Sequence, residues 1–266
     1  MFAIMGMVKH MKIISIQKTK GKTSDKYKLK LEDGEELILQ DQIIIDHNLL
    51  FKKEIDETLR FTLAKENTYY EIYHKTVSYI MKKLRSELEI KKYLEKYQLS
   101  KQDEEKLIHK LKSLHFIDDA LYAKSYVADK LNFTNEGPLK LKSDLEQQKI
   151  DSSIIEEVIE KIELEPLKTN MIRWCEKKVR LNKKYSATMM KQKLTMEMNR
   201  LGYPKDFIIE CLEGISFSNS QIIESEYQKL RRKFEKKYQE KELYYKVKEK
   251  LYQKGFSSEE INSVMK

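Results

Sequence analysis

The sequence has few of the residues that break helices or cross-link a chain. Its 266 residues include 7 Gly, 3 Pro and 2 Cys. So few Gly and Pro residues argue against an all-β sandwich or a Gly-rich nucleotide-binding fold, and they favour long helices. Cys175 and Cys211 fit neither a disulfide framework nor the ligand spacing of a zinc site. Their low number is typical of a reducing compartment, so we expect a cytoplasmic protein.

Long apolar runs and catalytic motifs are also missing. No stretch approaches the roughly 20 apolar residues that span a bilayer. The apolar start, Met1–Val8, has no basic region and no small-residue cleavage site, so we do not expect a signal peptide. No Walker A, GxSxG or GxGxxG motif occurs, and the five His residues show no HExxH and no Cys at metal spacing. We therefore expect no enzyme, no cofactor and no metal site.

Charge, in contrast, is plentiful. Charged residues make up 36% of the chain, and 52 Lys and Arg against 43 Asp and Glu give a net charge of +9. Hydrophobic residues still reach 40%, and 16 of them are Tyr, so the chain can form a core and wholesale disorder is not expected. A positive balance of this size favours anionic partners through its general field.

The first 58 residues show the period of two that is typical of strands. Residues 12–16 predict one strand, and residues 26–31 alternate Lys with Tyr or Leu. Asp33-Gly34 precedes a further apolar alternation, and Asp-Gly between two strands is a strong hairpin signal because Gly tolerates a positive φ. Three short strands are not stable alone. We therefore expect residues 1–58, including a short helix at 41–50, to pack on the helices that follow.

From residue 59 the apolar spacing is helical and the chain repeats. The breaks between helices align at steps of 51, 53 and 53 residues, on Leu99, Ile150, Tyr203 and Phe256. The position five residues before each is also apolar: Leu94, Leu145, Met198 and Leu251. Each period has room for three helices with short loops. We expect a mainly α fold of four three-helix repeats, at 59–116, 117–166, 167–216 and 217–266, forming an elongated curved body with a small N-terminal β segment.

Capping residues mark the predicted helix starts. The capping box pairs a Ser or Thr with a Glu three residues later, and it fits Thr68…Glu71, Ser86…Glu89, Ser153…Glu156 and Ser257…Glu260. Asp118 and Asp119 are adjacent and cannot face each other on a helix, so we interpret them as caps rather than as Mg²⁺ ligands. For Glu87 we favour a capping role over an ion pair with the basic helices. Gly202 and Gly255 lie where a helix ends in a left-handed residue.

Three segments of the helical region carry recognisable motifs. Residues 116–127 fit the pattern F-x-D-D-x-x-[YF]-A-x-x-Y-V and closely resemble the segment of that pattern in the RecX family. Residues 83–88 resemble its R-x-[RT]-S-x-x-E-L opening, although Glu87-Leu88 follow Ser86 directly. Residues 136–150 resemble its G-P-x-x-[IL]-x-x-x-L-x-x-K-G-I stretch, with Lys149 in place of the second Gly. The resemblance covers roughly residues 60–266, and the β segment is similar to that of the Gram-positive members.

The resemblance implies a regulator of the RecA recombinase in recombination, DNA repair and the SOS response. Members of the family bind the RecA–DNA filament along its deep helical groove and mostly inhibit its ATPase and strand exchange. They are built from three-helix repeats, which the period of this sequence predicts independently. The partners implied are the RecA filament and single- and double-stranded DNA, with no membrane, and the chain is expected to be a monomer.

The positive charge is concentrated in the predicted third repeat. Residues 168–205 hold eleven basic residues and only two acidic ones, Glu176 and Glu197. The spacing predicts that Arg173, Lys177, Arg180 and Lys184 share one helix face. We interpret this set as an electrostatic footprint for DNA phosphates or for an acidic filament groove, the alternative being a solvated helix face. The candidate DNA- or filament-binding residues are Arg173, Lys177, Lys178, Arg180, Lys183, Lys184, Arg231, Arg232, Lys236 and Lys237.

Aromatic residues and two other functions complete the predictions. Tyr side chains interleaved with Lys can stack on bases, but at helical spacing we expect most of them to be half-buried between units. Trp174 is expected to anchor the core of its repeat, the alternative being a contact residue. Two other functions stay open, a stand-alone helical-repeat DNA-binding protein and a scaffold solenoid for another protein.

Overall fold

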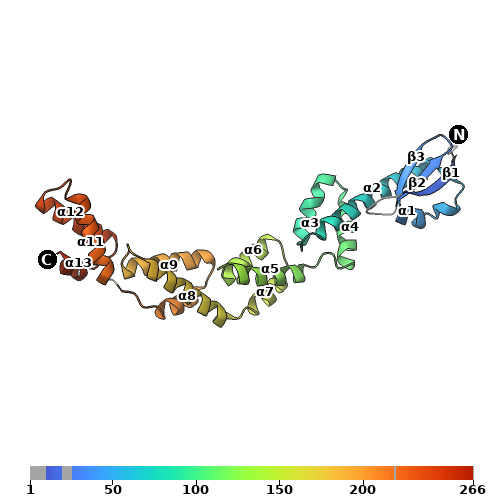
Figure 1. The fold of residues 1–266 in the computed structure, drawn as a ribbon. Coiled ribbons are helices and arrows are strands. Elements are labelled where there is room, and N and C mark those ends of the chain that lie inside the picture. Colours follow the sequence, from blue (N-terminus) through green and yellow to red (C-terminus); the bar gives the residue numbers. More distant parts are fainter. Residues whose placement is uncertain (1–9, 20–25, 219, 266) are drawn as a thin grey trace, which may run out of the picture. The chain divides into compact units, whose positions relative to one another are not determined.

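The chain forms two compact parts, residues 1–119 and 120–266. The computed structural model describes residues 10–19, 26–218 and 220–265 (Figure 1), and the apolar start at residues 1–8 lies outside these ranges. The described residues form four strands and thirteen α-helices, so the predicted mainly α class is confirmed. None of these helices is both long enough and apolar enough to cross a bilayer.

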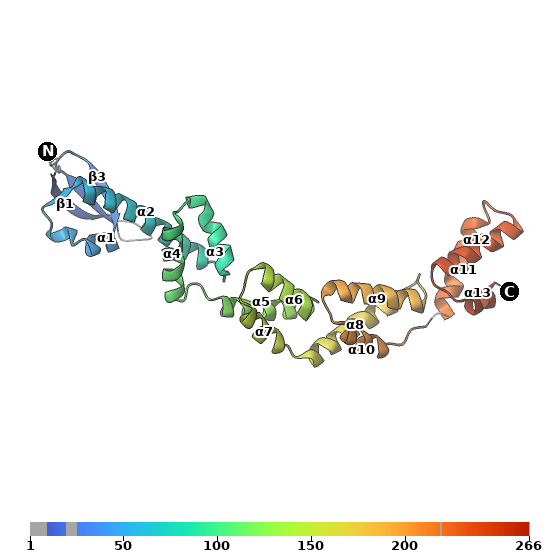
Figure 2. The same cartoon turned by 180° about the vertical axis from the view of Figure 1, so that it is seen from behind.

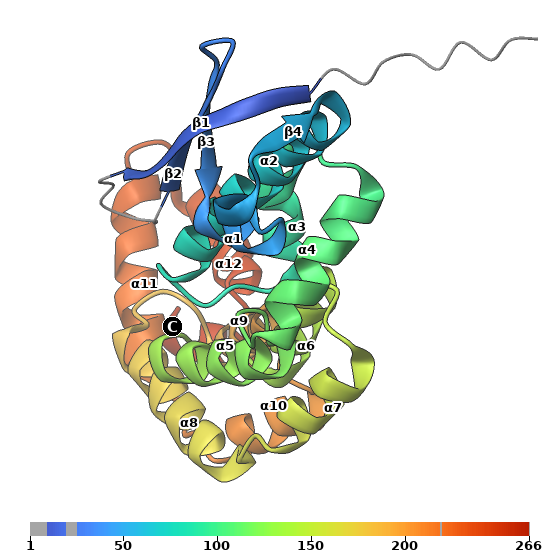
Figure 3. The same ribbon diagram turned by 90° about the vertical axis from the view of Figure 1, so that its right-hand side faces the viewer.

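An antiparallel sheet opens the first part (Figure 3). Its strands are β1 (His10–Thr19), β2 (Lys26–Leu31), β3 (Glu36–Gln40) and β4 (Glu54–Asp56), in the order β3-β2-β1-β4. The predicted Asp33-Gly34 hairpin joins β2 to β3, with Gly34 at a φ of 88°. Strand β4 was not predicted. The expected helix at 41–50 is present as α1 (Asp41–Asp46) followed by the 3-10 turn η1 (Leu49–Phe51).

A long helix links the sheet to the first helical group. Helix α2 spans Glu57–Ile80 and is followed by α3 (Glu87–Leu94), the 3-10 turn η2 (Glu95–Tyr97) and α4 (Lys101–Ser113). The N-terminal half of α2 buries Leu63 in the core of the sheet, while its C-terminal half buries Ile72 and Ile80 against α3 and α4. The β segment therefore packs on the following helices, as predicted.

The second part contains three successive groups of three helices (Figure 2). They are α5 (Asp119–Phe133), α6 (Pro138–Gln147) and α7 (Ser152–Glu160); α8 (Leu164–Leu181), α9 (Ala187–Leu201) and α10 (Lys205–Glu213); and α11 (Ser220–Phe234), α12 (Glu240–Gln253) and α13 (Ser258–Val264). Each group encloses its own hydrophobic core. Helix α8 begins at Leu164, ahead of the repeat border predicted at residue 167. The borders themselves stay a prediction.

All four helical groups have a left-handed residue between their second and third helices. The residue before each aligned apolar position has a left-handed backbone, with φ of 50°, 57°, 86° and 81° at Gln98, Lys149, Gly202 and Gly255. In three groups the next backbone N–H donates to the carbonyl five residues earlier, at 3.2 Å for Ile150, 3.1 Å for Tyr203 and 3.3 Å for Phe256. This is the bond that closes a helix in a Schellman motif. It holds both apolar residues of the repeat inside the core.

Two of the four predicted capping boxes are confirmed, at Ser86 with Glu89 and at Ser257 with Glu260. The other two are wrong. Thr68 lies inside α2, where its hydroxyl donates to the carbonyl of Ala64, and the cap of this helix is Asp56. Ser153 lies inside α7, and its backbone N–H donates to the true cap, Asp151.

The capping role predicted for Glu87 is also wrong. Its carboxylate forms ion pairs with Lys91, at 2.6 Å, and with Lys112. Partial burial would raise the pKa of Glu87, but the hydrogen bonds from the two lysines outweigh it and hold the pKa below its usual range. Asp119 stands at the start of α5 as expected, yet its Oδ1 accepts the backbone N–H of Glu87 at 2.9 Å and so caps α3.

Neighbouring groups in the second part are joined through backbone hydrogen bonds. Where α9 ends, the carbonyl of Leu201 accepts the N–H of Gly137 at 2.6 Å, and the carbonyl of Gly202 accepts the N–H of Leu139 at 3.0 Å. The next junction uses the equivalent end of α12, because the N–H of Ser186 donates to the carbonyl of Lys254 at 3.2 Å. The C-terminal end of α9 is therefore fixed to the start of α6, and the C-terminal end of α12 to the start of α9.

Candidate nucleic-acid interface

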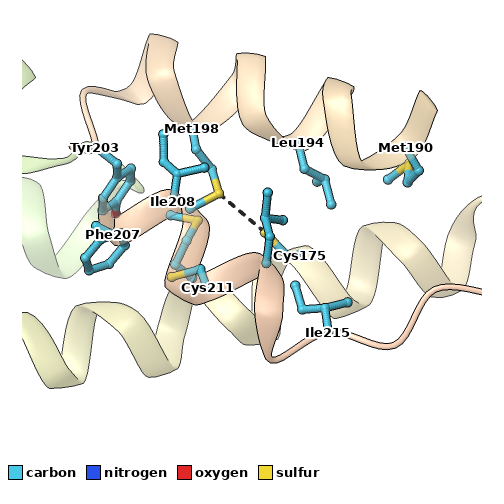
Figure 4. Close-up of a cluster of buried hydrophobic side chains, with 11 residues drawn as sticks. Cys175, Met190, Leu194, Met198, Tyr203, Phe207, Ile208, Cys211 and Ile215 are labelled. Carbon is cyan, nitrogen blue, oxygen red and sulfur yellow. Dashed lines mark hydrogen bonds between the residues drawn. The ribbon is translucent and has the colours of Figure 1, made fainter. Parts of the chain in front are cut away.

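The core of the third helical group determines which side of α8 faces outward. Met171 and Cys175 of α8 are buried against Leu194 and Met198 of α9, and the Cys175 Sγ lies 3.8 Å from the Met198 Sδ (Figure 4). Burial raises the pKa of Cys175 to about 12. Cys175 is therefore a packing residue, and its position leaves the opposite side of α8 to the solvent.

Three of the predicted site residues lie together on that outer side. Arg173, Lys177 and Arg180 are exposed, and they share one face because they stand at i, i+4 and i+7. The ion pairs of this group, within the described residues, join Lys168 to Glu210 and Lys178 to Glu197. The three outer side chains therefore have no carboxylate partner there.

Lys184 does not continue this face, which corrects the prediction. Helix α8 ends at Leu181, and both Lys183 and Lys184 lie in the loop before α9. Asn182 shapes this loop, because its Oδ1 accepts the backbone N–H of Lys184 at 3.1 Å and that of Tyr185 at 3.0 Å. An Asn side chain that bonds the backbone competes with helix formation, so the helical spacing stops here.

Lys178 is also less available than predicted. Its Nζ donates to both carboxylate oxygens of Glu197, at 2.8 and 2.7 Å, and lies 4.2 Å from the centre of the Trp174 ring. Trp174 itself is partly buried at the margin of the core. Trp174 therefore packs against the core as expected, and the Lys178–Glu197 ion pair beside it neutralises one of the candidate charges.

A hollow of about 620 Å³ lies beside the loop, and it contains residues absent from the predicted set. Tyr185 is central to it, since the Nζ atoms of Lys193 and Lys184 lie 4.5 and 5.2 Å from its ring centre. Leu181 and Met196 contribute apolar surface. Tyr185 and Lys193 fit the pattern of aromatics interleaved with lysines, but nothing in the sequence distinguishes Tyr185 from the other Tyr residues of the chain.

The remaining candidates lie in the fourth helical group. Arg231 and Arg232 are in the last turn of α11, and Lys236 and Lys237 follow it in a turn. All four are exposed. Cations at the C-terminal end of a helix also stabilise its dipole, so this set has a structural use as well. It belongs to a separate core from the residues on α8.

Two of the His side chains lie beside carboxylates. The Nε2 of His47 lies 2.6 Å from Glu66, and His10 lies 3.5 Å from Glu54. Across the described ranges, no three His, Cys, Asp or Glu side chains are grouped so that they could hold one metal ion.

The sequence of this chain is similar to sequences of known proteins. The sequence model of the second three-helix domain of RecX matches residues 118–159, and that of the third matches residues 220–265. The regulatory protein RecX of Bacillus cereus (strain 03BB102) is 30% identical over 224 residues, which cover 82% of this chain and 83% of that protein. The chain belongs to the RecX family. The basic helices α8–α10 lie between the two matched RecX domains.

Further RecX proteins match much of the chain. The RecX of Oceanobacillus iheyensis is 24% identical over 262 residues, covering 95% of this chain and 96% of its own. A crystal structure of a regulatory protein RecX superposes with a TM-score of 0.67 at 22% identity and covers 77% of this chain and 100% of its own. A second, from Lactobacillus salivarius, has a TM-score of 0.51 and covers 56% of this chain. The relatives are named regulatory proteins, so this chain belongs to a family of regulatory proteins.

Proposed function

We propose that this chain binds the RecA–DNA filament along its groove and lowers the RecA ATPase and strand exchange. It would do so as a cytoplasmic monomer, without catalysing a reaction, in the regulation of recombination and DNA repair. Membership of the RecX family supports RecA as the partner. The observation that carries the proposal is the exposed row of Arg173, Lys177 and Arg180, which has no carboxylate partner among the described residues.

The geometry of this row suits a regular array of phosphates. Seven residues of helix separate Arg173 from Arg180, which is about 10 Å at 1.5 Å per residue. Phosphates follow one another at about 3.4 Å along the axis of a duplex strand, so the row spans several of them. Each contact releases counterions, and binding through this face therefore weakens steeply as salt rises.

The test is the RecA ATPase on single-stranded DNA, at two salt concentrations and with this chain below stoichiometry. We expect the ATPase to fall, and to fall less at the higher salt. The variant with Arg173→Glu, Lys177→Glu and Arg180→Glu should need at least about tenfold more protein for the same effect. Unchanged ATPase and filament lifetime at saturating protein would contradict the proposal.

A matched control separates this face from net charge. Lys52, Lys53 and Lys92 are exposed and lie in the first part of the chain, so reversing them gives the same change in charge at another place. This control variant should inhibit as the unmodified chain does. If both triple variants lose inhibition equally, the general field of the protein acts and the α8 face does not.

The Tyr185 hollow favours a second candidate function, direct binding of DNA without RecA. Tyr185 with Lys184 and Lys193 places an aromatic ring beside two cations, the combination with which proteins bind single-stranded nucleic acids. A gel shift with DNA alone, together with an unchanged RecA ATPase, would favour this candidate. Absence of both effects would favour a scaffold for another protein.

A further inference from the structure

A second basic surface lies in the first part of the chain, where strands β2 and β3 meet α2 and α3. A cavity of about 790 Å³ opens there, and four of its lining residues are Lys26, Lys75, Lys82 and Lys96. Glu71 is the one carboxylate among the lining residues given for it. The cavity therefore has an excess of positive charge, and none of these lysines belongs to the basic residues of α8–α13.

Most of this charge is not neutralised by the protein. Glu71 pairs with Lys26 at 3.0 Å. Within the described ranges the ion pairs include no partner for Lys75, Lys82 or Lys96. Other lysines nearby are paired, as Lys83 is to Glu89 at 3.3 Å and Lys91 to Glu87 at 2.6 Å. Three unpaired lysines thus gather at the cavity: Lys75 of α2, Lys82 just after α2, and Lys96 in η2.

The wall of the cavity holds its cations in place but offers no free ring face. Tyr79 and Tyr93 stack with their ring centres 3.9 Å apart and their planes within 10°. The Arg85 guanidinium lies 3.5 Å from the centre of Tyr79, and the Lys96 Nζ lies 3.8 Å from that of Tyr93. Tyr79 already covers one face of Tyr93, so Lys96 covers the other. The site can therefore recognise charge, and it cannot stack a base on this pair.

The charge continues from the cavity along the sheet. Lys26, Lys28 and Lys30 alternate along β2 with residues that face the core, so they follow one another on its other face. Lys28 shares its charge with Glu36 at 2.7 Å, and Lys30 is exposed. The three span about 13 Å of strand. A row of this length ending in a cavity suits an extended chain of anions better than one small ion.

We propose that this sheet-end basic surface (Lys26, Lys28, Lys30, Lys75, Lys82 and Lys96) binds the phosphodiester backbone of a nucleic-acid strand. It is a second site, separate from the α8 face, and it reads phosphate and not base. The assignment does not depend on the function proposed above, because a chain without effect on RecA can still bind a strand here. A free nucleotide carries the same phosphate chemistry, and the experiment distinguishes the two sources.

The first measurement is lysine footprinting of the full chain. The protein is acetylated with a limiting reagent alone, with a short oligothymidylate, or with ATP, and the modified lysines are quantified by mass spectrometry. We expect the oligothymidylate to slow acetylation of Lys75, Lys82 and Lys96 by about tenfold at low salt, and to leave Lys52 and Lys53 unchanged. Protection by ATP but not by the oligonucleotide would overturn the assignment to a strand. Protection by neither would overturn the site.

The second measurement is the salt dependence of oligonucleotide binding by two matched variants. Each phosphate contact with a single strand contributes about 0.7 to the slope of log Kd against log salt. The Lys75→Glu, Lys82→Glu variant should therefore lose about 1.4 of this slope. The Lys52→Glu, Lys53→Glu variant should keep it, and equal slopes would overturn the proposal. A Lys75→Gln, Lys82→Gln variant repeats the test if the reversed one does not fold.

The two sites fail in distinguishable ways. Reversal of Arg173, Lys177 and Arg180 removes the α8 face, so protection of Lys96 in that variant reports the sheet-end basic surface alone. If Lys96 stays protected while inhibition of RecA is lost, both assignments stand. If protection of Lys96 disappears with the α8 face, no independent site exists in the first part.

Discussion

Replacing Gly202 by Ala tests the junction between two helical groups, because three glycines share one backbone conformation and differ in their surroundings. Gly34, Gly202 and Gly255 have φ of 88°, 86° and 81°. An Ala at each site therefore meets the same backbone strain, about 1 kcal/mol. At Gly34 the added Cβ meets no atom within 4 Å. At Gly202 it would lie 2.4 Å from the backbone nitrogen of Lys140 and 2.5 Å from its Cβ.

The cost at Gly202 follows from what must move. A backbone atom cannot rotate away, so α6 and the end of α9 have to separate. Separation removes the two hydrogen bonds from Gly137 and Leu139, worth about 1 kcal/mol each. We expect Gly202→Ala to lower the free energy of unfolding by about 3 kcal/mol and Gly34→Ala by about 1 kcal/mol.

Gly255→Ala should lower the free energy of unfolding by an amount between those for Gly34→Ala and Gly202→Ala. Its Cβ would lie 2.6 Å from the Oγ of Ser186, a side-chain atom that can turn away. That Oγ caps α9 by accepting the N–H of Met189 at 3.2 Å, so turning costs about 1 kcal/mol. The expected loss is about 2 kcal/mol.

Urea unfolding measures all three variants. Trp174 is the single Trp and reports the third helical group, which both Gly202 and Gly255 adjoin, while circular dichroism follows Gly34→Ala. Asn adopts the left-handed conformation with less strain than Ala, so Gly34→Asn should lose little and Gly202→Asn nearly as much as Gly202→Ala. Equal losses at Gly34 and Gly202 would refute the reasoning, because backbone strain alone would then account for both.

Three further predictions concern buried groups. Burial alone would raise the pKa of Glu226, but hydrogen bonds from Lys254 and Lys229 outweigh it and lower the pKa. The stability that this carboxylate contributes is therefore lost as the pH falls below about 4.5. The free energy of unfolding should depend less steeply on pH in this range for Glu226→Gln than for the unmodified chain. Leu145→Ala should cost about 2–5 kcal/mol in urea, whereas Leu139→Ala, 53% exposed on the same helix, should cost below about 0.5 kcal/mol. Burial raises the thiol pKa values of Cys175 and Cys211 to about 12 and about 11; both should react with a thiol reagent at pH 8 only in urea, and reaction of the folded chain would contradict their placement.

The repeat was predictable because its signal is local. A left-handed residue ends each second helix, and the apolar residues before and after that turn recur with it, as Met198 and Tyr203 do around Gly202. Asp33-Gly34 is an equally local signal. Strand β4 has no such signal, since three residues carry no periodicity. It is a strand only because Glu54, Ile55 and Asp56 pair with residues 10–12 of β1.

The false capping boxes fail for the same physical reason. Thr68 and Ser153 have the right residue three positions later, yet a carboxylate nearer the true helix start takes the role: Asp56 for α2 and Asp151 for α7. A motif of four residues cannot register whether the helix has already begun. Only at Ser153 do neighbouring caps compete within the first turn, since Thr68 lies in the middle of α2.

Counting charged residues in the sequence does not predict which of them are free to bind a partner. The sequence places eleven basic residues against Glu176 and Glu197 but does not say which of them is neutralised. The packing of α9 on α8 decides that Glu197 meets Lys178. Asn182 ends the helix before Lys184, so the shared face contains three residues and not four.

The effect of the Arg173, Lys177 and Arg180 side chains on the free energy of unfolding distinguishes a binding surface from a structural one. Arg173 and Lys177 are four residues apart and Lys177 and Arg180 three, and like charges at these spacings destabilise a helix by about 0.2–0.5 kcal/mol per pair. Arg180 recovers a similar amount from the helix dipole. Replacing all three by Gln should therefore change the free energy of unfolding by less than about 0.5 kcal/mol, while inhibition of RecA and its salt dependence are lost. Urea unfolding and the ATPase assay on one preparation measure both. A loss of stability that matches the loss of inhibition would show that these side chains support the fold, and the function would then have to lie elsewhere.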